Sequence, residues 1–435
     1  MIGTDLQIAA RSLAKHTKRN LLLGAAIASV TALLVVLGGL AAGIKAAMLE
    51  SATTLMTGHV NVGGFYKVTS GTAAPLVGEA DRVMAEVRRS VPELDYLTAR
   101  GRGWAKAVAE IGSMDLVLAG LDIRNETGFR RVVQPVAGKL DDLAQPGAIL
   151  IFEDQAKRLG AHVGDALTLS APTARGMSNT ADVKVAVVAR SVGLLSSFTA
   201  FLEAETLRQL YQLKPGTTGA VHVYLEDPKA AGAVAARLRG ALADAGWRVM
   251  EADPRPYWEK LMAKVNNEDW TGQKLDVTTW EDEVSFMSWI LTAVQWLSGI
   301  LISILLVIVV VGIMNTLAIA IRERTREIGT LRAIGMQRRK VLWLFLLEAG
   351  LLGLAGTLAG AAAGVAIAAG LDAAHIAVPE SVQMFLLQRQ LTLVVRPATV
   401  AAYVAGIAAA TTLAAVYPAW HAAKLRPITA MHHVG

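Results

Sequence analysis

The stretch that decides the fold of this chain covers residues 312–336 and reads GIMNTLAIAIRERTREIGTLRAIGM. Its first ten residues are uncharged and continue an apolar run that begins at Met287. Its second part places Ile328, Leu331 and Ile334 at helical spacing among charged residues. The stretch therefore predicts a membrane-spanning helix that leaves the bilayer, followed by a short amphipathic helix at the membrane surface.

Three further apolar runs have the length that a spanning helix needs, which is about 20 residues. They cover residues 21–44, 341–370 and 398–417, and Glu348 is the only charged residue inside them. Of the 435 residues in the chain, 53% are hydrophobic and 18% are charged, whereas about a quarter of a soluble domain is charged. Buried core helices are the alternative. Basic residues flank the runs, however, so we predict four spanning helices.

The first run has a second interpretation as a signal peptide, because the small residues Ala42, Ala46 and Ala47 stand near its end. Its apolar part is longer than the roughly 7–15 residues that are usual for a signal. We therefore expect this run to stay in the protein as a spanning helix.

The charges beside these runs predict their orientation. The three short flanks of the runs carry thirteen Lys and Arg but three Asp and Glu, whereas residues 46–284 have a net charge of −4. Short basic flanks stay in the cytoplasm. Four spans then put the long segment and the loop 371–397 on the outer side of the membrane. The net charge of +6 is a topology signal, and nucleic acid is not expected as a partner.

Residues 46–286 are numerous enough for a folded domain. We expect a mixed α+β domain of two subdomains, one near residues 58–110 and 215–265 and the other near 111–212. The predicted strands cover residues 59–62, 148–152, 166–170, 183–188, 220–224 and 248–251, and the predicted helices cover residues 78–91, 153–159, 228–245 and 254–265. The fold class is thus an integral membrane α-helical protein whose periplasmic domain is inserted between helices 1 and 2.

Patterns typical of catalysis or metal binding are absent from the sequence. The chain has no Cys, and His59, His162 and His222 lack the spacing of metal ligands. Serine-hydrolase and zinc-protease motifs are also absent. We therefore expect that the chain is not an enzyme.

Three other segments have structural interpretations. Asp141 and Asp142 suit a solvated turn, and residues 281–283 suit a solvated helix end. Residues 193–202 are apolar, which fits a buried strand or an exposed loop that contacts a lipid or a partner.

The amphipathic segment after residue 321 has two physical interpretations. It could dock into a groove of another protein, or it could rest on anionic lipid. The residues alone leave both open.

The residues around this segment resemble the FtsX-like permeases. The resemblance rests on Asn315, on residues 323–329 (ERTREIG), on residues 331–335 (LRAIG) and on residues 345–349 (FLLEA). Residues 6–19 and 417–428 look like the two ends of that family, and residues 149–169 are similar to the outer domain of its MacB and LolC/LolE branch.

In this family the corresponding segment is a coupling helix that docks on a cytoplasmic ABC ATPase dimer. The resemblance implies that ATPase coupling here uses Glu323, Arg324, Thr325, Arg326, Glu327, Ile328, Gly329, Leu331, Arg332, Ala333 and Gly335. The sequence contains no G-x-x-x-x-G-K-[ST] motif, so we expect ATP and Mg²⁺ on a separate ATPase and no cofactor in this chain.

The resemblance also implies a second permease subunit, identical or different, and a bacterial inner-membrane location in contact with lipid. A periplasmic adaptor or carrier is a further implied partner. The implied function is mechanotransmission that extracts or exports a lipoprotein, lipid, peptide or drug. The alternative is a scaffold that transmits ATPase motion to a periplasmic enzyme or sensor and transports nothing.

The mechanism suggests three further features. Gly356, Gly360 and Gly364 recur every four residues, as in closely packed spanning helices. Glu348 inside the third run suggests either a functional group or, as we favour, a hydrogen bond between helices or snorkelling to the headgroups. We also expect a rigid lever with helical residues from about Asp276 into the second span.

The expected order of segments follows from these runs. It comprises a cytoplasmic N-terminal segment (1–20), a first span (21–45), the periplasmic domain (46–286), a stalk with the second span (287–321), the coupling loop (322–340), a third span (341–370), a periplasmic loop (371–397), a fourth span (398–417) and a cytoplasmic tail (418–435).

Overall fold

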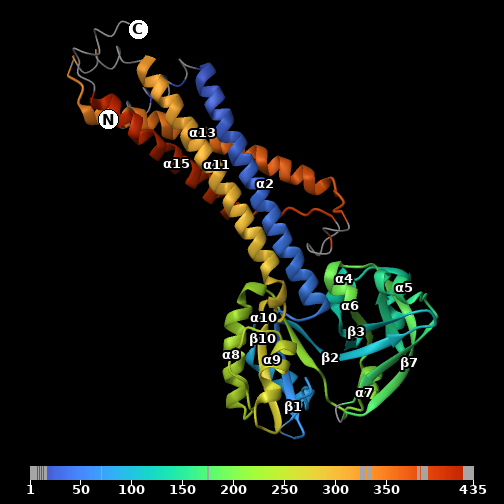
Figure 1. Cartoon of the computed structure of the whole chain (residues 1–435). Helices are drawn as coiled ribbons and strands as arrows, with labels where there is room; N and C mark the ends of the chain where they lie inside the picture. Colours follow the sequence, from blue (N-terminus) through green and yellow to red (C-terminus); the bar gives the residue numbers. More distant parts are fainter. Residues whose placement is uncertain are drawn as a thin grey trace. The chain divides into compact units, whose positions relative to one another are not determined.

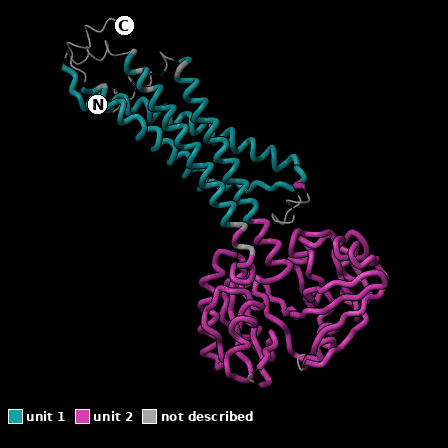
Figure 2. The backbone as a smooth tube through the Cα atoms, in the orientation of Figure 1, with its two compact units in different colours: residues 1–45, 292–377, 390–435 teal, residues 46–291, 378–389 magenta. Residues whose placement is uncertain are grey.

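A computed structural model gives the architecture of two compact units, which Figure 2 distinguishes by colour. Unit 1 comprises Met1–Lys45, Thr292–Ala377 and Gln390–Gly435, and unit 2 comprises Ala46–Leu291 and Val378–Arg389. The structure describes residues 7, 9, 11, 13, 17–69, 71–173, 176–323, 330, 333, 335–379, 383 and 390–424.

The described part of unit 1 is built from long helices (Figure 1). They are α2 (Thr17–Leu55), α11 (Ser288–Glu323), α13 (Arg338–Ala373) and α15 (Pro397–Lys424), and the first two continue into unit 2. Each contains a stretch long and apolar enough to cross a membrane: Asn20–Leu55, Thr292–Thr316, Arg338–Ala373 and Pro397–His421. The four apolar helices predicted from the sequence are therefore present.

Unit 1 has an apolar core with contributions from all four helices. The core includes Ile27 of α2, Ile313 of α11, Ala349 of α13 and Ile407 of α15. Glu348 also lies inside this unit and is 6% exposed. Only 11% of the most apolar stretch of α11 is buried within the chain. Most of this helix therefore presents apolar side chains outward, as a lipid-facing helix does.

Unit 2 contains a sheet with the strand order β10-β1-β9-β2-β3-β8-β5-β7-β4, and β6 pairs with β2 and β7. The strands are β1 (Val60–Lys67), β2 (Leu94–Val108), β3 (Ser113–Leu121), β4 (Pro135–Gly138), β5 (Ala148–Phe152), β6 (Ala166–Pro172), β7 (Ser178–Ala189), β8 (Thr199–Glu203), β9 (Ala220–Leu225) and β10 (Gly272–Thr279). The helices are α3 (Ala80–Ser90), α4 (Thr127–Val132), α5 (Glu153–Leu159), α6 (Gly193–Phe198), α7 (Ala204–Tyr211), α8 (Ala231–Asp244), α9 (Tyr257–Ala263) and α10 (Trp280–Glu283). Short 3₁₀ helices cover Ile123–Asn125, Leu140–Ala144, Pro228–Ala230, Val265–Asn267 and Ser285–Met287.

Strand β2 divides unit 2 into two halves, because it changes partners along its length. Its residues up to Arg100 pair with β9, and its residues from Gly101 pair with β3. The first half contains β1, β9, β10 and the helices α3 and α8, and Figure 1 shows α8 beside β10 and β1. The second half contains β3 to β8 and has its own apolar core, which includes Ile149 and Leu202. The second half is thus an insertion between β2 and β9 of the first.

Several predicted elements of unit 2 are confirmed closely. The strand at 148–152 and the helix at 153–159 have the predicted bounds, and Gly160 ends the helix with φ +64. Only glycine adopts such an angle without a penalty. The angle therefore explains why Gly160 ends the helix, as the sequence predicts.

Three predictions are wrong. Residues 248–251 form only an isolated bridge, Val249 with Leu275, because Pro254 and Pro256 follow closely and cannot donate to a ladder. Residues 193–202 begin with helix α6, and only their second part is the buried strand β8. The lever cannot be helical from Asp276, because β10 continues to Thr279 and α11 begins at Ser288.

Candidate functional site

The expected ATPase-coupling residues lie at the end of α11 and in the segment after it. Helix α11 ends at Glu323, Ala333 is exposed, and Gly335 has φ +103, which favours glycine. The remaining expected coupling residues are Arg324, Thr325, Arg326, Glu327, Ile328, Gly329, Leu331 and Arg332, and these lie outside the described residues.

The three glycines of α13 form a row against α2. A methyl group added at Gly364 would lie 2.8 Å from Cβ of Val35 and 2.9 Å from the carbonyl oxygen of Ala32. Gly356 and Gly360 are similarly close to atoms of α2, and all three glycines are buried. Small residues let two helix backbones approach in an apolar environment. Along this row α13 and α2 are therefore in close contact.

The last turn of α2 is fixed to the sheet of unit 2 by Arg100 of β2. Its Nη1 donates to the carbonyl oxygen of Thr54 at 2.7 Å, while Nε and Nη2 donate to the two carboxylate oxygens of Glu126 at 2.7 and 2.6 Å. Tyr224 of β9 donates to the carbonyl oxygen of Thr53 at 2.9 Å. Burial works against the charge of Arg100, but Glu126 together with Tyr224 and Tyr96 raises the pKa of the guanidinium above its usual value.

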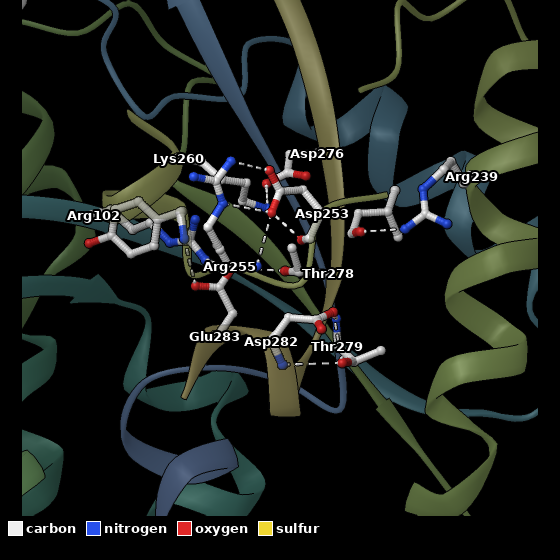
Figure 3. A network of polar contacts seen from close by, with 12 residues as sticks. Arg102, Arg239, Asp253, Arg255, Lys260, Asp276, Thr278, Thr279, Asp282 and Glu283 are labelled. Atoms are coloured by element: carbon white, nitrogen blue, oxygen red, sulfur yellow. Dashed lines mark hydrogen bonds and ion pairs between the residues drawn. The ribbon is translucent and has the colours of Figure 1, made fainter. Parts of the chain in front are cut away.

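Helix α10, which precedes α11, is held by a second set of contacts (Figure 3). Glu283 accepts hydrogen bonds from Oγ1 of Thr278 at 2.7 Å and from the backbone N–H of Tyr257 at 3.3 Å. Nη2 of Arg102 lies 3.7 Å from Oε1 of Glu283, and Cζ of Arg102 lies 4.1 Å from the centre of the Tyr257 ring. Glu283 is 5% exposed. The prediction of a solvated helix end at 281–283 is therefore wrong for Glu283.

The N-terminus of α10 has its own cap. Oγ1 of Thr279 accepts from the backbone N–H of Asp282 at 3.3 Å, and the carboxylate of Asp282 accepts from the backbone N–H of Thr279 at 2.8 Å. This reciprocal capping box satisfies two donors that a helix end leaves open. The direction in which the chain enters α10 is therefore fixed locally as well.

A buried ion pair lies beside this second set of contacts. Nζ of Lys260 in α9 lies 2.5 Å from Oδ2 of Asp276 in β10, and the two side chains are 0% and 4% exposed. Burial raises the pKa of the Asp276 carboxyl, and Lys260 opposes that rise. Arg102 and Glu283 belong to the same network of charged residues, which also includes Asp253 and Arg255 (Figure 3). Burying such charges costs desolvation energy, which close pairing and further hydrogen bonds must offset.

The histidines have structural surroundings. His222 is 1% exposed, and among the described residues neither of its ring nitrogens has a hydrogen-bond partner. Burial, and then Arg100 and Arg102, lower the pKa of His222 well below its usual value. His59 accepts a hydrogen bond from the backbone N–H of Leu225, and His162 is exposed. Among the described residues no cluster of His, Asp and Glu could hold a metal ion.

The structure thus brings together residues that the sequence analysis did not select. Arg100 and Arg102 alternate with Gly101 and Gly103 along one strand, and this unusual pattern was the one available signal. Their partners Glu126 and Glu283 belong to distant elements, which periodicity does not reveal. The last turn of α2 and the short helix α10, which both lie in unit 2, are therefore each held by an arginine side chain of β2.

Comparison with known proteins identifies relatives over part of the chain. Residues 299–427 match the family model described as "FtsX-like permease C-terminal". The chain is 33% identical over 133 residues to the pyoverdine export ATP-binding/permease protein PvdT of Pseudomonas putida, a match that covers 31% of this chain and 18% of that protein. It is 36% identical over 123 residues to the macrolide export ATP-binding/permease protein MacB of Chlorobium luteolum, covering 28% and 16%.

A third relative extends the match. The MacB protein of Chromobacterium violaceum is 29% identical over 184 residues, which cover 42% of this chain and 27% of that protein. The matched parts thus span less than a third of these relatives. Among solved structures, the periplasmic region of MacB from Actinobacillus actinomycetemcomitans has 12% sequence identity and a TM-score of 0.28, and covers 43% of this chain and 85% of that one. Residues 299–427 are thus similar to the FtsX-like permeases, and the relatives that this chain matches include ABC transporter proteins of the MacB type.

Proposed function

We propose that the chain is the permease subunit of an ABC transporter in a bacterial inner membrane and that it works with a separate ATPase. The observation that carries the proposal is the position of the residues that resemble the coupling helix. They follow α11 directly and fall inside the matched region 299–427. The relatives PvdT and MacB are named as ATP-binding and permease proteins in one, which supports an ATPase partner.

In this proposal the four apolar helices cross the membrane, and residues 322–340 dock on the cytoplasmic ATPase. The close row of Gly356, Gly360 and Gly364 on α2 lets α13 move with α2 as a packed pair. ATP and Mg²⁺ bind to the ATPase alone. A second permease subunit, identical or different, completes the membrane part.

Unit 2 is the periplasmic part in this proposal, and it acts by changing shape. Within unit 2, Arg100 holds the last turn of α2, and the contacts of Glu283 hold α10, the short helix that precedes α11. Movement of these helices is therefore transmitted to β2 rather than lost in a flexible linker. The cargo in this proposal is a lipoprotein, lipid, peptide or drug that is handed to a periplasmic adaptor or carrier, and the names of the relatives point to export of pyoverdine or of a macrolide.

Affinity purification of the tagged chain from native membranes tests the central step. We expect an ABC ATPase to co-purify and to be lost in Glu327→Lys and in Arg332→Glu. The substitution Arg88→Glu at an exposed site on α3 of unit 2 is the matched control and should leave the association intact. Retention of the ATPase in both coupling variants would remove the basis of the coupling assignment.

Reconstituted vesicles separate transport from the scaffold function. ATP-dependent release or export of a cargo supports transport. ATP-dependent activation of a periplasmic partner without any cargo movement supports the scaffold instead. Both outcomes require the ATPase to bind, so they test a later step than the purification does.

A further inference from the structure

The two halves of unit 2 meet at a short run of glycines. Gly101 of β2 pairs with Gly120 of β3, where β2 changes its partner from β9 to β3. Side-chain atoms of Leu207 fill the space over both glycines. The joint between the halves therefore has little side-chain bulk of its own, and glycine allows its backbone a wider range of angles.

Arg100 and Arg102 stand on either side of this joint, and each one crosses it. Arg100 belongs to the part of β2 that pairs with β9 in the first half, but its carboxylate partner is Glu126 of the second half. Arg102 belongs to the part that pairs with β3 in the second half, but its carboxylate partner is Glu283 of the first half. Each arginine thus links its own half to the other half. We call the contacts Arg100–Glu126 and Arg102–Glu283 the two braces of the joint.

Gly63 of β1 makes the second brace possible. Nη1 of Arg102 lies 3.0 Å from the position that a Cβ of Gly63 would occupy. Ala220 of β9, which pairs with Gly63, is also small. The long arginine side chain can therefore pass over two neighbouring strands to reach Glu283.

The two braces differ in tightness. Arg100 makes two hydrogen bonds to Glu126, at 2.7 and 2.6 Å, and both side chains are almost fully buried. Arg102 is 3.7 Å from Glu283, beyond hydrogen-bond distance. Glu283 also has two other donors, Thr278 and the backbone of Tyr257. The contact between Arg102 and Glu283 can therefore change with less loss than that between Arg100 and Glu126.

A cavity of about 180 Å³ lies at the same joint. Its wall includes Asp81 and Met84 of α3 in the first half and Leu207 and Arg208 of α7 in the second, with Gly101 between them. Because opposite walls belong to different halves, a change in the angle between the halves changes the width of this cavity.

We propose that Arg102 and Glu283 are positioning residues that set the angle between the two halves of unit 2 about Gly101. The pair Arg100–Glu126 holds the joint together, and the pair Arg102–Glu283 keeps the two halves at the observed angle. Glu283 is the last residue of α10, so its contact with Arg102 also holds α10 against β2. The inference goes beyond the proposed function, since it concerns unit 2 by itself and needs no ATPase.

Pulsed electron paramagnetic resonance on the full chain in detergent tests the proposal. The chain has no Cys, so Arg88→Cys on α3 and Lys157→Cys on α5, both exposed, place one spin label on each half. The doubly labelled chain with Arg102 and Glu283 unchanged should give one narrow distribution of label-to-label distances. Glu283→Gln and Arg102→Met should each add a second distance whose population exceeds about 10%, the upper range of an ordinary minor state. The double variant should match the single ones, because both residues act through one contact.

Two comparisons decide between an electrostatic role and simple packing. Glu283→Asp keeps the charge but loses a methylene, whereas Glu283→Gln keeps the volume but loses the charge. We expect a smaller second population in Glu283→Asp, and packing alone predicts the reverse order. Glu93→Gln, which breaks an exposed ion pair with Arg237 inside the first half, is the matched control and should change nothing.

One narrow, unchanged distance in both Glu283→Gln and Arg102→Met would overturn the inference, and so would a larger effect in Glu283→Asp. Because the labels report without the ATPase, such a result leaves the proposed permease function in place. Loss of the proposed coupling to an ATPase would, conversely, leave the distance measurement unaffected.

Discussion

Arg100 and Glu126 form a bidentate pair in which both partners are removed from solvent, with exposed fractions of 2% and 1%. The third donor of the guanidinium is used as well, on the carbonyl oxygen of Thr54 at the end of α2. The side chain therefore joins three elements at once: β2, the segment before α4, and α2. Neither charge can be left alone there without a large desolvation cost.

We therefore predict that Glu126→Ala lowers the free energy of unfolding by about 3–5 kcal/mol, the usual cost of leaving one buried partner unpaired. Thermal unfolding of the full chain in detergent, followed by circular dichroism, measures the change. Glu93→Ala removes the partner of an exposed arginine and serves as the control. Equal losses of unfolding free energy in Glu126→Ala and Glu93→Ala would show that the buried pair stabilises the chain no more than the exposed pair does.

The pair of Lys260 and Asp276 predicts a pH dependence. Burial already raises the pKa of Asp276, and Lys260 limits that rise. Lys260→Met should raise the pKa further, so that the folded state takes up a proton that the unfolded state releases. Such a group stabilises the fold at low pH and loses that contribution as pH rises through the folded-state pKa. The midpoint temperature of Lys260→Met should therefore fall, relative to the unaltered chain, between acidic and neutral pH.

The double variant Lys260→Met/Asp276→Asn is the control for this effect. It removes the titrating carboxyl group. The difference in midpoint temperature between this variant and the unaltered chain should therefore stay constant between about pH 4 and pH 8, the range in which a raised carboxyl pKa would act. A pH slope that persists in the double variant would assign the effect to another residue.

His222 predicts a pH dependence of the opposite sign. Its pKa is lowered in the folded state, first by burial and then by Arg100 and Arg102. As pH falls below about 6.5, the unfolded chain binds a proton that the folded chain excludes, which costs up to about 1.4 kcal/mol per pH unit. Midpoint temperatures between pH 7 and pH 5 measure this loss. His222→Gln should reduce the slope, whereas His162→Gln at an exposed site should leave it unchanged.

The glycine row of α13 predicts an effect on helix packing. A methyl group at Gly360 would lie within 3 Å of the Cα of Ala28 and of the Cβ of Thr31 in α2. Gly360→Ala should therefore destabilise the chain by about 1–3 kcal/mol, as overpacking does. Gly370→Ala in the same helix, where the added methyl would contact nothing within 4 Å, is the matched control. It should be neutral or slightly stabilising, because alanine favours helix. Equal midpoint temperatures in detergent would contradict close packing here.

The sequence predicted the elements whose signal is local. A run of apolar residues without charges defines a helix such as α15 by itself, and the buried strand β5 followed by the amphipathic α5 needs only its own residues. The end of α2 was missed because Lys45 and Glu50 interrupt the apolar run, although the helix continues to Leu55. Its last turns lie in unit 2, where the backbone carbonyl oxygens of Thr53 and Thr54 accept hydrogen bonds from Tyr224 and Arg100 of the sheet.

The junction contacts could not be predicted in the same way. Glu283 resembles the solvated acids that precede it in the chain, and only the position of Arg102 and Thr278 makes it a buried residue. Arg100 finds Glu126 across the change of partner in β2, which depends on the topology of the whole sheet. Local periodicity carries no information on such pairs.

The division of β2 between two halves also has a consequence for the order of synthesis. The first half is completed only when β9 and β10 have been made, because they pair with β1 and β2 from the start of unit 2. The inserted segment of the second half lies between β2 and β9 in the chain, and its core, which includes residues of β2, can close before β9 has been made. During translation, β1 and the first part of β2 therefore have unpaired edges while the inserted half folds. In that interval β3 already pairs with the later part of β2. Strand β2 then offers its earlier part to β9, which completes the sheet of the first half.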